Sequence, residues 1–154
     1  MPEAVIVDAV RTPIGRAFKG SLVGVRADEL AATPLRALRD RNPDVDFDQT
    51  VDVMMGSASG IGEQGYNVGR NATLLAGFDA GVPACTVNRF CASSLQTLRM
   101  AFHAIRAGEG EQYVAAGVEA YRARASARRS PTRPSTRCST APRARCTTST
   151  SRWG

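Results

Sequence analysis

The chain lacks the features that mark several common classes of protein. No hydrophobic stretch approaches the roughly 20 residues that a membrane span needs, and no charged segment followed by an apolar one marks an N-terminal signal. The four cysteines, Cys85, Cys91, Cys138 and Cys146, form no CxxC pair and have no zinc-like spacing with the single histidine, His103. We therefore expect a cytoplasmic protein without a membrane partner, a metal site or a disulfide framework.

Acidic residues are absent after Glu119. Residues 1–119 hold 11 Lys and Arg against all 14 Asp and Glu, a net charge of −3, whereas residues 120–154 hold nine arginines and no acid. No Val, Ile, Leu, Met or Phe follows Val118, so little apolar surface is available to offset the roughly 1–2 kcal/mol per residue that ordering a backbone costs. We predict a folded body over 1–119 and a disordered basic tail over 120–154.

The origin of this tail has two interpretations. Its Arg, Ala, Pro, Ser, Thr and Cys content is typical of a GC-rich coding sequence read in the wrong frame. We hypothesise that a frameshift near residue 120 replaced the rest of a longer protein. The rival is an authentic arginine-rich arm that binds nucleic acid, for which nine arginines provide suitable charge. The frameshift is favoured because the tail has neither a lysine nor an aromatic repeat.

Strand-like and helix-like segments alternate along the body. Apolar runs rich in β-branched residues predict strands, and apolar residues at helical spacing predict helices. The predicted strands are Ala4–Ala9, Thr50–Met55, Cys85–Phe90 and Gln112–Ala116, and the predicted helices are Glu29–Arg39 after Asp28, Asn67–Leu75 before Gly77, and Cys91–Ala107 before Gly108. This βαβαβαβ order implies an α/β fold whose largely parallel sheet is covered on both faces.

One cysteine stands at the junction between a predicted strand and a predicted helix. Residues 83–90 indicate a short strand, and from Ser94 the apolar residues recur at helical spacing. Cys91 therefore lies in or just before the first helical turn, where unpaired N–H groups and the positive end of the helix dipole favour a thiolate. Two interpretations follow. Cys91 is a nucleophile, or it is a small buried apolar residue, as free cysteines commonly are.

Several motifs of the body agree, in order, with one enzyme family. They are VIVDAVRTPIGRAFKGSL, MMGSASGIGEQGYNVGRNATLLAGFDAGVPACTVNRFCASS, and TVNRFCASSLQTLRMAFHAIRAGEG followed by YVAAGVE. From about Val5 to Glu119 the chain resembles the N-terminal half of the thiolases, which cleave or form 3-ketoacyl-CoA by acyl transfer to a cysteine. The form CASS followed by Gln-Thr is most similar to the thiolases of bacterial fatty-acid oxidation.

The resemblance implies a fold and a set of partners. The body over 1–119 would be a partial thiolase N-terminal domain, an incomplete half of the thiolase-like α/β fold. Cys91 would be the acyl-thioester nucleophile of an acetyl-CoA C-acyltransferase. Acyl-CoA and CoA would be substrates, with no cofactor bound. A homo-oligomer or a partner subunit is also implied.

The resemblance further implies catalytic groups that this sequence does not match. In the family a histidine activates the nucleophile and a second cysteine moves the proton at the substrate α-carbon, and both lie in the second half of a much longer chain. His103 stands twelve residues after Cys91 on one predicted helix, about 18 Å away at about 1.5 Å per residue, too far to act as its base. Cys85 does not match the second cysteine. We therefore expect the isolated chain to be inactive.

Other residues of the matching motifs receive structural roles, and one alternative function stays open. Ser93 and Ser94 are expected to hydrogen-bond backbone groups of the first helical turn. Structural roles are also expected for Gly65, Asn67, Arg70, Asn88 and Arg89, and Glu119 has no proton-transfer task. The alternative is a non-catalytic interaction module that pairs with a full-length thiolase subunit or binds nucleic acid through the basic tail.

Overall fold

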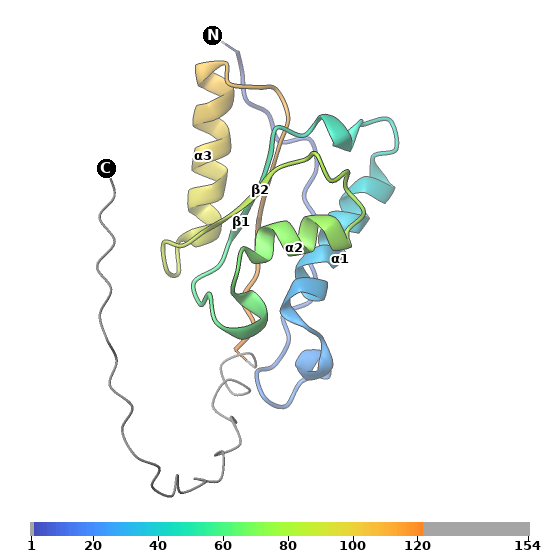
Figure 1. The fold of residues 1–154 in the computed structure, drawn as a ribbon, viewed down its shortest axis with the longest axis vertical. Helices are drawn as coiled ribbons and strands as arrows, with labels where there is room; N and C mark the ends of the chain where they lie inside the picture. The colour runs from blue at the N-terminus through green and yellow to red at the C-terminus, as the bar shows by residue number, and fades with distance from the viewer. Residues whose placement is uncertain (1, 122–154) are drawn as a thin grey trace, which may run out of the picture.

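The computed structural model describes residues 2–121 (Figure 1). The tail predicted from residue 120 onward, with Cys138 and Cys146, therefore lies outside the described residues apart from its first two positions. The elements in chain order are η1 (Ser21–Gly24), α1 (Ala27–Arg41), η2 (Phe47–Gln49), β1 (Asp52–Gly56), η3 (Gly62–Gln64), α2 (Val68–Leu75), β2 (Ala84–Val87), α3 (Ser93–Ala107) and β3 (Tyr113–Gly117). Among the helices of this described part, none combines the length and the apolar character that crossing a bilayer requires.

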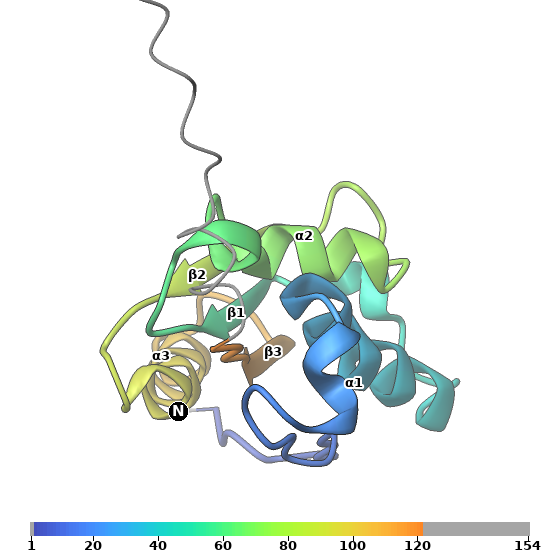
Figure 2. The same ribbon diagram turned by 90° about the horizontal axis from the view of Figure 1, so that it is seen from below.

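A three-stranded parallel sheet forms the centre of the body. The strand order is β2-β1-β3, and Met54 of β1 lies opposite Cys85 of β2 and Ala115 of β3. Helix α3 lies on one face of the sheet, and α1 and α2 lie on the other (Figure 2). The predicted α/β architecture with a parallel sheet covered on both faces is confirmed, as are the three predicted helices and three of the four predicted strands.

The main hydrophobic core lies between the sheet and the pair α1 and α2. Side chains alternate along a strand, and this places Val53, Met55 and Val114 on the same face as Leu35 of α1. Helix α2 approaches the sheet closely at Gly69. A Cβ atom added there would lie 2.4 Å from the carbonyl oxygen of Cys85, so only glycine allows this distance between helix and sheet.

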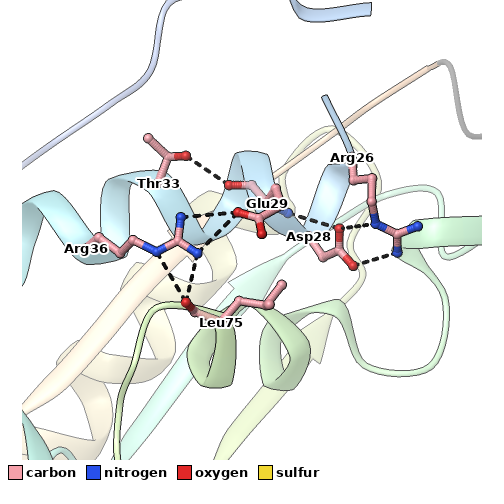
Figure 3. Close-up of polar contacts among 6 residues, drawn as sticks. All are labelled: Arg26, Asp28, Glu29, Thr33, Arg36 and Leu75. Carbon is pink, nitrogen blue, oxygen red and sulfur yellow. Dashed lines mark hydrogen bonds and ion pairs between the residues drawn. The ribbon is translucent and has the colours of Figure 1, made fainter. Parts of the chain in front are cut away.

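Charged side chains at the start of α1 and within it stabilise this helix and its packing on α2 (Figure 3). At its start, the Arg26 guanidinium donates two hydrogen bonds, of 2.8 and 3.0 Å, to the buried carboxylate of Asp28. Further along, Arg36 pairs with Glu29 at 3.1 Å and donates to the carbonyl oxygen of Leu75 at the end of α2. Because the last carbonyls of a helix have no partner within it, this contact stabilises both the end of α2 and its packing on α1.

The predicted strand Ala4–Ala9 is wrong. Within the described residues this segment lies in an irregular stretch, and Val5, Ile6 and Val7 are largely exposed. A groove of about 640 Å³, lined by residues 4–8 on one side and residues 111–115 on the other, separates the segment from β3. A run of β-branched residues becomes a strand only beside an edge whose N–H and C=O groups it can reach, and this segment does not pair with β3.

Candidate functional site

Three loops meet at the carboxyl edge of the sheet. Because the strands are parallel, the segments that follow β1, β2 and β3 all leave from this edge, the usual place for a site in an open α/β sheet. They are residues 57–61, 88–92 and 118–121. Cys91 belongs to the second of these loops, directly before α3.

Two glycines allow the first turn of α3 to lie directly against this edge. A Cβ atom at Gly56, the last residue of β1, would lie 2.5 Å from the backbone nitrogen of Ser94. A Cβ atom at Gly117, the last residue of β3, would lie 1.9 Å from the Ser94 hydroxyl oxygen. The two glycines that end β1 and β3 therefore also set the position of the helix that follows Cys91.

The turn before Cys91 is held in a left-handed conformation. Phe90 has φ +49°, which is uncommon for a residue other than glycine and persists where surrounding contacts hold it. The Asn88 side-chain oxygen accepts a hydrogen bond of 2.9 Å from the Phe90 N–H. The Ser93 hydroxyl accepts from the Arg89 N–H at 2.9 Å and donates to the Phe90 carbonyl at 2.6 Å. Asn88 and Ser93 thus stabilise this turn, although the Ser93 hydroxyl bonds backbone groups before α3 and not, as was expected, those of its first turn.

Cys91 is a free and exposed thiol at the end of this turn. Helix α3 begins at Ser93 with Ala92 as its N-cap, so Cys91 stands just before the first turn, as its sequence position predicts. The N-cap methyl group cannot accept a hydrogen bond from the first N–H groups of α3. Because Cys91 is exposed, its interpretation as a small buried apolar residue does not hold.

Cys85 has a different environment. Its half-buried thiol donates a hydrogen bond of 3.6 Å to the carboxylate of Asp52 on the neighbouring strand. Burial first, and then the negative charge and hydrogen bond of Asp52, raise the pKa of Cys85 to about 11. Cys85 is therefore almost entirely protonated near neutral pH, which makes it a poor nucleophile.

A hydrogen-bond network joins the loops after β1 and β3. The Glu119 carboxylate accepts a hydrogen bond of 2.8 Å from the Ala58 N–H. The buried side chain of Gln64 donates to the carbonyl oxygens of Ser59 and Ala120, both at 3.2 Å, and accepts from the Ala120 N–H at 2.8 Å. Sequence reasoning missed this network. Sequence offered no signal for its central bond, because the Glu119 carboxylate contacts a backbone N–H.

The remaining residues of the predicted motifs lie outside this network. His103 lies on the exposed side of α3. Asn67 is the N-cap of α2, accepts a hydrogen bond from the Arg70 N–H and donates one of 2.8 Å to the Ala84 carbonyl. The Arg70 guanidinium donates to carbonyl oxygens of the loop before β2, and Gly65 ends η3. Asn67, Arg70 and Gly65 thus have the structural roles expected for them.

Comparisons with known proteins agree with this arrangement. Residues 4–153 match the family profile of the thiolase N-terminal domain. A beta-ketoadipyl-CoA thiolase of Acinetobacter baylyi is 53% identical over 119 residues, which are 77% of this chain and 29% of that protein. A beta-ketoadipyl-CoA thiolase of Pseudomonas aeruginosa is 54% identical over 117 residues, 76% of this chain and 29% of that protein. A 3-ketoacyl-CoA thiolase of Pseudoalteromonas translucida is 48% identical over 119 residues, 77% of this chain and 31% of that protein.

The matches cover most of this chain but only a part of each relative. The chain spans about three tenths of the length of the curated relatives it matches. The likeness to those relatives covers 117 to 119 residues, whereas the family profile reaches residue 153. The predicted domain boundary between 119 and 120 therefore stays a prediction. The match of the profile to nearly the whole chain, together with the parallel α/β body, establishes that the chain belongs to the thiolase family.

Proposed function

We propose that Cys91 is the acyl-accepting nucleophile of thiolase chemistry and that this chain is the nucleophile-bearing part of an acetyl-CoA C-acyltransferase. The observation that carries the proposal is the exposed thiol of Cys91 at the start of α3, presented by a left-handed turn at the carboxyl edge of the sheet. Cys85, the other cysteine of the described residues, is half-buried and its pKa is raised to about 11, so it is not a competing nucleophile.

The proposed reaction is an acyl transfer in two steps. The Cys91 sulfur attacks the 3-keto carbon of a 3-ketoacyl-CoA, the bond between C2 and C3 breaks, and C2 takes up a proton to leave as acetyl-CoA. The thiol of CoA then attacks the Cys91 thioester, acyl-CoA leaves and the Cys91 thiol is restored. Family resemblance assigns the proton transfers to a histidine and a second cysteine outside this chain, so we propose that the chain binds the acyl group without turnover.

The substrate class has two candidates. The resemblance of the CASS motif favours the fatty-acid oxidation type, with unbranched acyl chains. The names of the relatives at 51–54% identity support beta-ketoadipyl-CoA, whose acyl chain ends in a carboxylate, whereas a relative named for 3-ketoacyl-CoA is 48% identical. We favour a beta-ketoadipyl-type substrate. A cytoplasmic location and a second thiolase subunit, either another copy or a full-length partner, are part of the same proposal.

Acylation of the 154-residue chain by acetyl-CoA tests the role of Cys91. Peptide mass spectrometry should find an acetyl thioester on Cys91 and none on Cys85, and the adduct should be absent from a Cys91→Ala variant while a Cys85→Ala variant keeps it. Thiolysis of acetoacetyl-CoA should not exceed a heat-treated control. Acetylation of Cys85 in preference to Cys91, or turnover that survives Cys91→Ala, would overturn the proposed nucleophile. Robust turnover that Cys91→Ala abolishes would overturn the proposal that the chain is inactive alone.

A further inference from the structure

The backbone of Ala58 is held from two sides. Its N–H donates to the Glu119 carboxylate at 2.8 Å, and its carbonyl oxygen accepts a hydrogen bond of 3.0 Å from the Asn88 side-chain amide. Glu119 follows β3 and Asn88 follows β2, while Ala58 lies in the loop after β1. The backbone of one residue, Ala58, therefore connects all three loops at the carboxyl edge.

A second hydrogen bond links Asn88 to the turn that precedes Cys91. With its amide nitrogen on Ala58, the Asn88 side chain points its oxygen at the Phe90 N–H, 2.9 Å away. That bond stabilises the left-handed backbone of Phe90, and the next residue is Cys91. The orientation of the Asn88 amide is thus coupled to the conformation that presents the thiol, because both ends of the amide are occupied at once.

The far end of this series of contacts is fixed by a buried side chain. Gln64 is 1% exposed and lies 3.5 Å from the second carboxylate oxygen of Glu119 through its amide nitrogen. It also binds both backbone groups of Ala120, the residue that follows Glu119. Glu119 is therefore anchored on one side by Gln64 and directs its other oxygen toward Ala58.

We infer that Glu119 is a positioning residue for Cys91, acting through the backbone of Ala58 and the side-chain amide of Asn88. The inference rests on the proposed function, in which Cys91 is the nucleophile. Among the described residues, the hydrogen bonds of Glu119 go to Ala58 and Gln64 and not to the Cys91 thiol. The Glu119 carboxylate holds the N–H of Ala58, the carbonyl oxygen of the same residue holds the Asn88 amide, and that amide holds the turn at Phe90 directly before Cys91.

The rate of Cys91 alkylation by iodoacetamide tests this inference in the 154-residue chain. Site-resolved mass spectrometry follows Cys91 and Cys85 in the same molecules, so that Cys85 reports any general opening of the fold. Glu119→Ala should lower the alkylation rate of Cys91 at least about threefold, a size typical of coupling within one hydrogen-bond network, and should leave the alkylation rate of Cys85 unchanged. Glu119→Gln keeps an oxygen for the Ala58 N–H and should restore most of the rate. Glu111→Ala, which removes an exposed acid before β3, is the matched control and should change nothing.

A double-mutant cycle separates positioning from other effects. Asn88→Ala, at an exposed site, should itself lower the alkylation rate of Cys91. Adding Glu119→Ala should then produce no further change, because the Asn88 hydrogen bonds that link Ala58 to Phe90 are already lost. Faster alkylation of Cys91 in the Glu119→Ala variant would overturn the inference. Removing a nearby negative charge favours the thiolate, so such a rise would show an electrostatic effect and not positioning. Additive effects, an unchanged rate, or a parallel rise in Cys85 labelling would overturn it too. Iodoacetamide needs no CoA recognition, so failure of acetyl-CoA to acylate Cys91 is a separate result that bears on the proposed function.

Discussion

The two faces of the sheet differ in how completely they are covered. On the side of α1 and α2, Met55 and Leu35 are 1% and 2% exposed within a continuous core. On the other side, the outer surface of α3 leaves Leu95 69% and Phe102 48% exposed beside the open groove along β3. Helices thus cover both faces of the sheet, but among the described residues the outer side of α3 has no second layer over it, which agrees with a chain that spans about three tenths of its relatives' length.

The largest effect is expected where the covered face is tightest. In Gly69→Val, the new Cβ would lie 2.4 Å from the Cys85 carbonyl oxygen, a backbone atom that cannot move aside without shifting β2. We expect a loss of about 4 kcal/mol or more in the free energy of unfolding, measured by urea denaturation followed by circular dichroism. Gly24→Val is the control, because a Cβ at Gly24 meets open space. Similar stability of the two variants would contradict the close contact between α2 and the sheet.

A matched pair of leucines compares the two faces directly. Leu35→Ala on the covered face removes a buried side chain and should cost about 2–4 kcal/mol in the free energy of unfolding. Leu95→Ala on the open face removes a side chain that water already reaches, and should change stability by less than about 0.5 kcal/mol. Equal costs for the two variants would mean that α3 is covered in solution by something that the described residues do not include.

The sequence predicted the covered face better than the open one. Within the predicted helix Glu29–Arg39, Leu30, Leu35 and Leu38 recur at helical spacing, and in the structure Leu35 lies in the core with Leu30 and Leu38 packed against it. The run Val5-Ile6-Val7 has the composition of a strand, but forming one depends on a neighbouring edge, and local sequence holds no information about that edge. At the site, in contrast, the position of Cys91 follows from a strand–helix junction that local sequence does encode.

The contacts around Cys91 were not predictable in the same way. Glu119 meets Ala58 across 61 positions of sequence, and the contacting group on Ala58 is its backbone N–H. Every residue except proline has a backbone N–H, so no sequence motif predicts this hydrogen bond. Alternation of strands and helices predicts which loops share an edge, while the particular hydrogen bonds among them depend on loop conformations such as the left-handed Phe90.

The open face is also expected to govern association. A contiguous apolar surface of this kind, with Leu98 and Phe102 both 48% exposed, favours self-association or partner binding over a free monomer. The double variant Leu98→Lys/Phe102→Lys should shift the chain toward the monomer in analytical ultracentrifugation. Leu74→Lys, at an exposed position on α2, should leave the distribution as it is. A wild-type chain that is monomeric at all concentrations would contradict this expectation.

A smaller effect is expected at the start of α1, on the covered side. Hydrogen bonds from Arg26 hold the pKa of the buried Asp28 carboxyl below its usual value of 3.8. The stability that this group contributes is therefore present above about pH 4 and is lost as the pH falls through the lower folded-state pKa. Asp28→Asn should cost about 1 kcal/mol at pH 7, and its difference from wild type should disappear in strong acid. Asp44→Asn, at an exposed site, is the control; a pH-independent cost of Asp28→Asn would contradict the account.

The most direct test of the central claim, that the carboxyl edge presents Cys91 as the reactive thiol, is the ratio of alkylation rates of Cys91 and Cys85 in the wild-type chain at pH 7. With its pKa at about 11 instead of 9.0, Cys85 has about a hundredfold smaller fraction of thiolate than an ordinary cysteine, and it is also half-buried. Limited treatment with iodoacetamide, read by peptide mass spectrometry, should label Cys91 at least about tenfold faster than Cys85. Equal labelling, or labelling of Cys85 first, would contradict the account.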